Sequence, residues 1–294
     1  MVFSVPLCSS AGRLALASCL SVATLAGAAS PAQPPVPPAP GADPLHVPFD
    51  RILDANVRDG LVYYRALQAG RGALDRYVGS LNVPKATYDG WSREAQMAFW
   101  VNAYNAVVLQ TVVNRYPIRG RSDDYPASSL RQVPGAFSQA AHRLAGRTVS
   151  LDEIEKTILP PFKEPRLQLA LGRGAVGSPR LRSEAYTAAR LEGQLKDVQA
   201  EFVADEHLLR VDRGGGQISV TAILSWHADS FIAAYDPGAT GPFAQRSPIE
   251  RALVAFITPH LLPLEREFVQ QNQFKVTYHP FDWSLNDLTG GARN

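Results

Sequence analysis

Residues 92–117 read SREAQMAFWVNAYNAVVLQTVVNRYP, and this stretch decides the fold. Its length and composition predict one long helix, with Ser92 as its N-terminal cap and Pro117 as the residue that stops it. No charged residue lies between Glu94 and Arg115, so no turn of the helix is suited to full exposure to water. We therefore expect this helix to be the buried centre of the protein.

Three amide side chains interrupt the apolar character of this stretch: Asn102, Asn105 and Gln110. A buried amide without hydrogen-bond partners costs about 1–3 kcal/mol, so polar partners must lie elsewhere in the fold. Asn102 and Asn105 are one helical turn apart and share one side of the helix. We expect these two asparagines, together with Tyr104, to contribute to a pocket.

The whole chain has the composition of a globular protein. Its 294 residues are 46% hydrophobic, and its formal net charge is +2. Nucleic-acid binding usually shows as a clustered excess of lysine and arginine, which this balance does not supply. We therefore expect no nucleic-acid partner.

The first 28 residues are predicted to be a signal peptide. Arg13 supplies its positive charge, residues 14–29 its apolar run, and Ala26 and Ala28 match the small-residue cleavage pattern. The apolar run is too short to span a membrane as a helix, so we expect no stable membrane span after cleavage. The expected location is the periplasm or outside the cell. Two alternatives remain open, namely lipidation at Cys19 and an uncleaved N-terminal anchor.

Both cysteines, Cys8 and Cys19, lie in this predicted leader. The cleaved chain would have no disulfide, no thiolate nucleophile and no cysteine metal ligand. The histidines show no metal-ligand spacing either, so we predict no metal site and no cofactor.

Residues 29–48 are rich in proline and alanine and are predicted to be a disordered segment, and residues 49–294 a single globular domain. We predict an α+β fold that is rich in helices, with a small mixed sheet around the central buried helix. Strands are expected over residues 61–64, 148–149, 166–171, 208–211, 217–220 and 274–278. Further helices are expected over residues 49–57, 74–81, 128–133, 151–159, 188–203, 224–234, 249–256 and 261–268.

A glycine-rich loop, GRGAVG over residues 172–177, follows the strand expected at 166–171. It formally matches a dinucleotide-binding fingerprint, but Ser178 and Pro179 follow where a helix should open, so we reject that interpretation. The loop exposes backbone NH groups, and Arg173, Arg180 and Arg182 are close in sequence. It could bind an anion; the alternative is a tight turn with solvated arginines.

Three residues are candidates for catalysis. Ser178 could be a nucleophile, although no nucleophile-elbow motif surrounds it. His227 could be a base, although a packed core histidine is the plainer interpretation. Asp282 lies beside Trp283 in the closing stretch YHPFDWSLN, residues 278–286. That stretch is either a wall of the pocket or a C-terminal latch in which Asp282 caps a turn.

Five stretches carry a family resemblance: DGLVYYRAL (59–67), FWVNAYNAVVL (99–109), LDEIE (151–155), residues 166–186, and the closing stretch. With them the chain resembles bacterial members of the domain of unknown function family 547. The resemblance implies a compact α+β domain and often an exported protein, without an established activity. Many relatives carry cysteines and a histidine where this chain has Gln168, Arg173 and Ser178. Chemistry that depends on a cysteine is therefore closed to this protein.

Three functions remain open from the sequence. The first is an exported, non-catalytic pocket protein of the cell envelope that binds a small molecule or an envelope component. The second is a divergent hydrolase or transferase that lacks a cysteine nucleophile and uses Asn102, Tyr104, Ser178, His227 or Asp282. The third is a structural interaction protein of the envelope.

Overall fold

The structure is a computed structural model that describes residues 43–289. The predicted signal peptide and most of the proline- and alanine-rich tract lie outside the described residues. The first helix, α1 (Val47–Asn56), begins two residues before the domain boundary expected at Phe49. His46 is buried, and its Nδ1 lies 2.8 Å from the hydroxyl of Tyr77. The last residues of the tract therefore belong to the folded domain.

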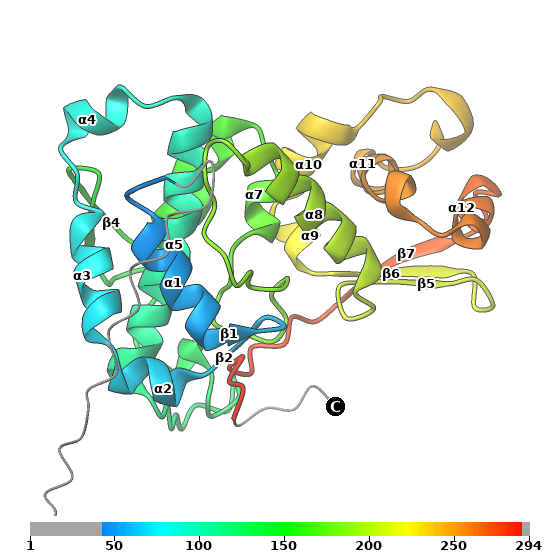
Figure 1. Ribbon diagram of the computed structural model, residues 1–294. Coiled ribbons are helices and arrows are strands. Elements are labelled where there is room, and N and C mark those ends of the chain that lie inside the picture. The colour runs from blue at the N-terminus through cyan, green and yellow to red at the C-terminus, as the bar shows by residue number, and fades with distance from the viewer. Residues whose placement is uncertain (1–42, 290–294) are drawn as a thin grey trace, which may run out of the picture. The chain divides into compact units, whose positions relative to one another are not determined.

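The predicted central helix is confirmed as α5 (Arg93–Arg115), and the hydroxyl of Ser92 caps it by accepting a hydrogen bond from the NH of Ala95. Helices α2 (Tyr64–Ala69), α3 (Gly72–Ser80) and α6 (Leu151–Glu153) pack around it (Figure 1). Within residues 43–289, no helix combines the length and apolar character that crossing a lipid bilayer requires.

The two buried asparagines of α5 each hold a distant piece of backbone. Asn102 bonds both the NH and the carbonyl of Tyr186, at 2.9 and 2.8 Å. Asn105 donates to the carbonyl of Ala170 at 3.0 Å and accepts from the NH of Gly172 at 2.8 Å. Both asparagines are at most 2% exposed, so the expectation of buried and partnered amides is confirmed. The helix thereby holds the start of the glycine-rich loop through Asn105, and the backbone of Tyr186, further along the chain, through Asn102.

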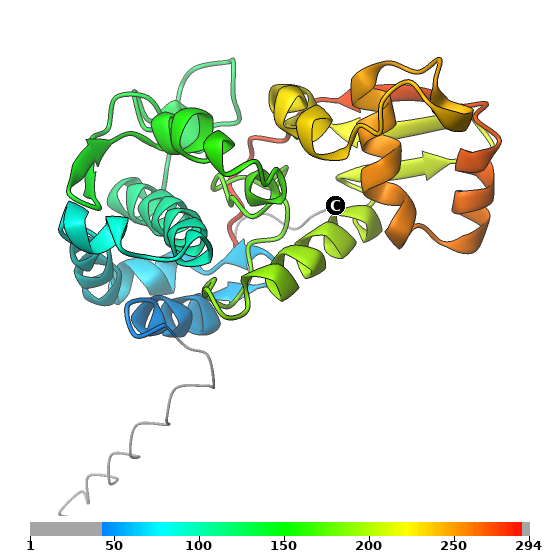
Figure 2. The ribbon, with the colours of Figure 1, turned by 90° about the horizontal axis from the view of Figure 1, so that it is seen from above.

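Over residues 43–289 the strands form three small sheets, and the largest of these is mixed as predicted. In this three-stranded sheet β6 pairs antiparallel with β5 and parallel with β7. Figures 1 and 2 show this sheet apart from α5, and it packs against α8 and α9. The strands are β1 (Val57–Arg58), β2 (Leu61–Val62), β3 (His142–Leu144), β4 (Arg147–Val149), β5 (Leu209–Asp212), β6 (Gln217–Thr221) and β7 (Lys275–His279).

The remaining helical segments are distributed along the whole described chain, so the fold is the expected helix-rich α+β domain. They are α4 (Lys85–Asp89), η1 (Leu130–Gln132), η2 (Ile154–Ile158), η3 (Pro160–Phe162), α7 (Arg166–Leu169), α8 (Leu191–Ala204), α9 (Ile223–Trp226), α10 (Ala228–Tyr235), η4 (Gly241–Phe243), α11 (Pro248–Ile257), η5 (Thr258–His260) and α12 (Pro263–Gln270).

The strand predicted over residues 166–171 is wrong, because its first four residues form the short helix α7. Glu164 starts that turn, since its carbonyl accepts from the NH of Leu167 and its carboxylate accepts from the NH of Arg166. Leu167, Gln168 and Leu169 are all buried, so the alternating leucines do not mark one face of a sheet. A buried helical turn satisfies the same pattern.

Several predicted helices also differ from the observed ones, and two of them show why. Helix α8 begins at Leu191, because Arg190 closes a turn onto the carbonyl of Thr187 before the helix starts. The helix expected over residues 224–234 is broken at His227 into α9 and α10. The break directs His227 into the interior, where it takes part in the site described below.

The closing stretch packs against the N-terminal part of the domain. The side chain of Asn286 accepts from the hydroxyl of Tyr64 at 2.8 Å and donates to the carbonyl of Gly60 at 2.9 Å. Short bridges join Asp287 to Val62 of β2, and Leu285 to the glycine-rich loop. This segment therefore ties together regions that are far apart in sequence.

Candidate functional site

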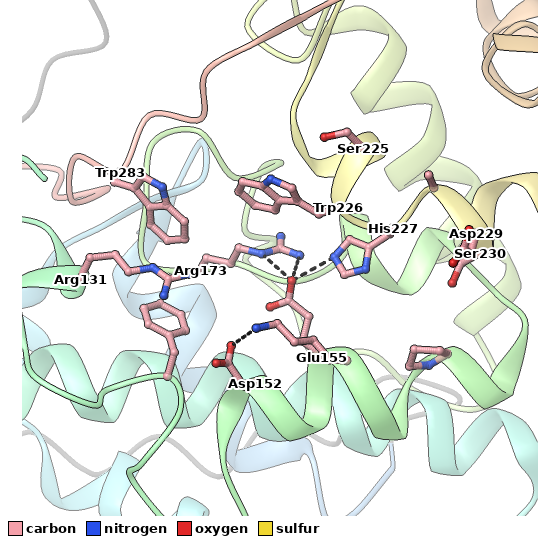
Figure 3. Close-up of a pocket in the computed structure, with 14 residues that line it drawn as sticks. Arg131, Asp152, Glu155, Arg173, Ser225, Trp226, His227, Asp229, Ser230 and Trp283 are labelled. Atoms are coloured by element: carbon pink, nitrogen blue, oxygen red, sulfur yellow. Dashed lines mark hydrogen bonds and ion pairs between the residues drawn. The ribbon is translucent and has the colours of Figure 1, made fainter. Parts of the chain in front are cut away.

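A pocket of about 690 Å³ opens beside the glycine-rich segment (Figure 3). Its volume lies in the range of about 300–1,000 Å³ that small-molecule sites usually have. Five separate stretches of the chain supply its walls. The lining residues are Arg131, Phe137, Asp152, Glu155, Lys156, Pro160, Arg173, Ser225, Trp226, His227, Ala228, Asp229, Ser230 and Trp283.

Glu155 is the centre of the pocket floor, where it lies on η2. Its Oε1 accepts hydrogen bonds from Arg173, at 2.8 Å from Nη2 and 3.2 Å from Nε. The same oxygen lies 3.0 Å from Nε2 of His227, and Figure 3 shows both contacts. Its Oε2 accepts from the buried hydroxyl of Tyr104 at 2.9 Å. Both carboxylate oxygens are therefore engaged within the protein.

Arg173 is 1% exposed, and its remaining donors are also satisfied. Its Nη1 donates to the carbonyls of Gln168 and Leu171, at 3.3 and 3.2 Å. Its backbone NH donates to the hydroxyl of Ser178 at 3.0 Å. A buried charge is tolerated when it is paired and fully hydrogen-bonded, which is the state of this guanidinium.

Close packing of the glycine-rich loop positions the floor and one wall together. A side chain at Gly177 would bring its Cβ within 2.6 Å of the backbone nitrogen of Asp282, so only glycine fits there. The NH of Gly177 donates to the carbonyl of Asp282, and the NH of Val176 donates to that of Ser284. These bonds hold the closing stretch against the loop and place Trp283 at the pocket.

The electrostatics of the floor keep Glu155 ionised. Burial alone would raise the pKa of this carboxyl, but Arg173 and His227 outweigh burial and hold the pKa well below its usual range. Burial, followed by the charge of Glu155, raises the pKa of the Tyr104 hydroxyl well above its ordinary value. At neutral pH the floor therefore contains a carboxylate, a guanidinium and a neutral phenol.

His227 links the floor to the open part of the pocket. Because the Glu155 carboxylate can only accept, Nε2 of His227 carries the proton of their hydrogen bond. Within residues 43–289 the other ring nitrogen, Nδ1, has no hydrogen-bond partner. This nitrogen is available to a molecule in the pocket.

Aromatic rings form the rim. Trp226 is 44% exposed, and its ring lies 6.0 Å from that of Trp283, with an interplanar angle of 18°. Phe281 packs against both tryptophans. The guanidinium of Arg131 lies 4.3 Å from the ring of Trp283 and 4.3 Å from that of Phe137. The pocket thus has a polar floor and a rim of aromatic rings with one arginine.

Part of the chain matches a known family. Residues 88–203 match the family described as a protein of unknown function, DUF547. The match covers less than half of the chain, and it includes α5, Glu155 and the glycine-rich loop. No curated protein and no solved structure shows a significant match. The matched region therefore supplies Glu155 and Arg173 of the pocket floor, while His227 and Trp283 lie beyond the DUF547 match.

The structure brings only some of the predicted site residues to this pocket. Arg173, His227 and Trp283 line it, whereas Asn102 and Asn105 are buried in contact with backbone groups. Asn105 is nevertheless adjacent to the loop through Gly172, as expected from the sequence. Tyr104 lies beneath the floor and reaches the site through Glu155.

The other predicted residues lie elsewhere. Arg180 pairs with Asp59 and Glu201, and Arg182 with Glu184, Asp197 and Glu201, so these arginines do not join Arg173 in one anion site. The hydroxyl of Ser178 is buried within the loop. Asp282 is exposed and accepts from the NH of Ser284, which is the turn-capping role considered for the latch. Among residues 43–289, no group of three or more histidine, cysteine or acidic side chains is placed to hold a metal ion.

Most residues of the pocket were not predicted from sequence, and the most important of these are Glu155, Arg131, Phe137 and Trp226. The sequence does contain a sign of Glu155 as a site residue: it is one helical turn from both Leu151 and Leu159, so this acidic residue falls on the apolar side of its helix. Arg131 and Phe137 lie in an irregular connection whose local pattern gives no indication of a site. Trp226 directly precedes the candidate base His227, but nothing else in the sequence marks it as part of a site.

Proposed function

We propose that this protein is an exported binding protein of the cell envelope, whose pocket holds a small molecule without catalysing a reaction on it. One observation carries the proposal: the acid, the base and the cation of the pocket floor are bonded to one another. Glu155 accepts from Arg173, His227 and Tyr104, and a carboxylate with so low a pKa is a weak general base. Ser178, the predicted nucleophile, is tied to the backbone of the loop.

The shape and lining of the pocket support a binding role. Small-molecule sites are usually concave, partly aromatic, and equipped with a few convergent polar groups. This pocket offers the rings of Trp226, Trp283 and Phe137, together with Nδ1 of His227 and the guanidinium of Arg131. A molecule with one flat apolar face and a few polar groups would match this lining.

Export is supported by the sequence of the first 28 residues, where Arg13, an apolar run and Ala28 follow one another. We expect the mature chain to begin near Ala29 and to be recovered from the periplasm or the medium. N-terminal sequencing of the protein from its native compartment checks this. An intact Met1, or a lipid on Cys19, would contradict the proposed processing.

The binding role can be tested with the purified mature chain and a library of envelope metabolites, using thermal shift. A ligand at 100 times its dissociation constant adds about 2.7 kcal/mol to stability, which is readily detected. Trp226→Ala removes an exposed wall of the pocket and should abolish the shifts. Tyr63→Ala, a matched control, removes an exposed aromatic ring outside the pocket and should retain them. Hits that persist in Trp226→Ala, or that are converted into products, contradict the proposal.

A divergent hydrolase or transferase is the second candidate, and the hydrogen bond between Glu155 and His227 favours it. A carboxylate that orients a histidine leaves the opposite ring nitrogen to take a proton from water or from a substrate hydroxyl. Mass spectrometry of library compounds after long incubation separates the two candidates. Products that form with the wild type and not with His227→Gln would establish the enzyme.

A further inference from the structure

The cations that line the pocket are not equivalent. Lys156 lies 3.1 Å from the carboxylate of Asp152, and Arg173 lies 2.8 Å from that of Glu155. Arg131, in contrast, forms no ion pair with any residue in the described range 43–289. Arg131 is therefore a positive charge at the pocket that, within the described residues, no carboxylate pairs with directly.

The hydrogen-bonding state of Arg131 points the same way. Within the described part of the chain, its side chain makes no hydrogen bond, and its Nε is buried without a partner. A guanidinium carries five NH donors in a fixed plane. Leaving the buried Nε unpaired is unfavourable, and an acceptor brought by a ligand would pair with the donors of this side chain that line the pocket.

The position of this guanidinium is nonetheless well defined. The rings of Phe137 and Trp283 each lie 4.3 Å from its central carbon, and Figure 3 shows Arg131 beside Trp283 at the pocket. Such cation–π contacts stabilise the position of the charge but accept none of its in-plane hydrogen bonds. A planar fork held in place in this way suits the two oxygens of a carboxylate, which it can bind with two parallel hydrogen bonds.

We propose that Arg131 anchors a carboxylate group borne on a flat apolar ring. This inference rests on the proposed function, since it names the ligand class of the same pocket. We infer the ring of the ligand from Trp226, an aromatic residue at the rim that is 44% exposed and can pack against it. We infer that the ligand carries a single negative charge. Lys156 and Arg173 are already paired within the protein, so only Arg131 remains to be neutralised, and exposed Asp229 would repel a more highly charged anion.

Benzoate, benzamide and inorganic phosphate are suitable probes, titrated into the purified mature chain and followed by calorimetry and tryptophan fluorescence. Benzamide has the shape of benzoate without its charge. We expect benzoate to bind at least tenfold more tightly than either benzamide or phosphate. Arg131→Gln should abolish the preference over benzamide. Arg147→Gln should preserve it, because Arg147 also contacts aromatic rings, those of Tyr88 and Trp100, but lies outside the pocket.

Arg131→Lys provides a second variant, which keeps the charge and loses the planar fork. It should weaken benzoate binding less than Arg131→Gln does, and circular dichroism checks that both variants are folded. Equal affinity for benzoate and benzamide, unchanged in Arg131→Gln, would overturn the anchor while leaving a binding pocket in place. Tighter binding of phosphate than of benzoate, or no binding of benzoate at millimolar concentration, would also overturn it. Failure of the proposed binding function is distinguished by a different result, namely library compounds whose thermal shifts are unchanged in Trp226→Ala.

Discussion

Two arginines of the same pocket differ in almost every physical respect. Arg173 on the floor is 1% exposed and bonded to a carboxylate and to backbone carbonyls. Arg131 at the rim is only partly buried and, within the described residues, contacts rings rather than acceptors. The charge of Arg173 is paired within the protein and stabilises the fold, whereas that of Arg131 is available to bind a ligand. A count of pocket charges alone would have treated the two as equal.

The largest expected effect is on the floor. Arg173→Met would leave the buried carboxylate of Glu155 without its main partner, and breaking a buried pair costs about 3–5 kcal/mol. Urea unfolding of the variant measures this loss. Adding Glu155→Gln to Arg173→Met should recover most of it, because the stranded charge is then removed. A loss below about 1 kcal/mol would mean that the floor pair is not structural.

The asparagines of α5 should have an intermediate effect. Asn105→Leu strands the carbonyl of Ala170 and the NH of Gly172, and Asn102→Leu strands both backbone groups of Tyr186. Each change should lower the free energy of unfolding by about 1–3 kcal/mol in urea melts. Only Asn105→Leu should also weaken pocket ligands, since it releases the backbone that carries Arg173. Unchanged stability in either variant would show that its amide is not buried and partnered.

The floor also predicts a pH dependence. Because the pKa of Glu155 is lower in the folded protein than its ordinary value of 4.5, the unfolded chain takes up the proton first as the pH falls. The stabilisation is therefore complete above pH 4.5 and is lost progressively below it. Below that pH the wild type should lose stability more steeply than Glu155→Gln, by up to about 1.4 kcal/mol per pH unit. Parallel stability curves for the two proteins would contradict the assignment.

The smallest effect on stability should follow Arg131→Gln. Cation–π contacts at exposed sites contribute about 0.5–1 kcal/mol, and losing them is partly offset by removing an unpaired buried donor. We expect the free energy of unfolding to change by less than about 1 kcal/mol. A loss as large as that of Arg173→Met would erase the distinction between the two arginines.

The elements that were predicted from sequence are those whose signal is local. The uncharged run of α5, its buried amides and the hairpin of β5 and β6 each follow from a few neighbouring residues. The pocket rim depends instead on residues 131, 137, 226 and 283, which only the folded chain brings together. The strand expected at 166–171 failed because alternating leucines also suit a helical turn that is buried all round. Glu155 was within reach of sequence analysis, as an acid on an apolar helix face.

The bond between Asn286 and Tyr64 joins residues 222 positions apart, and it belongs to the segment that carries Trp283. Bringing together residues so far apart in sequence costs more conformational entropy than forming a contact between residues close in sequence. Contacts of this kind therefore slow folding. The central helix, Glu155 and Arg173 all lie before residue 204, whereas Trp283 belongs to this closing segment. The ligand site is therefore complete only when the closing segment has packed against the rest of the domain. Capture of a ligand is thus restricted to chains in which that long-range contact has formed.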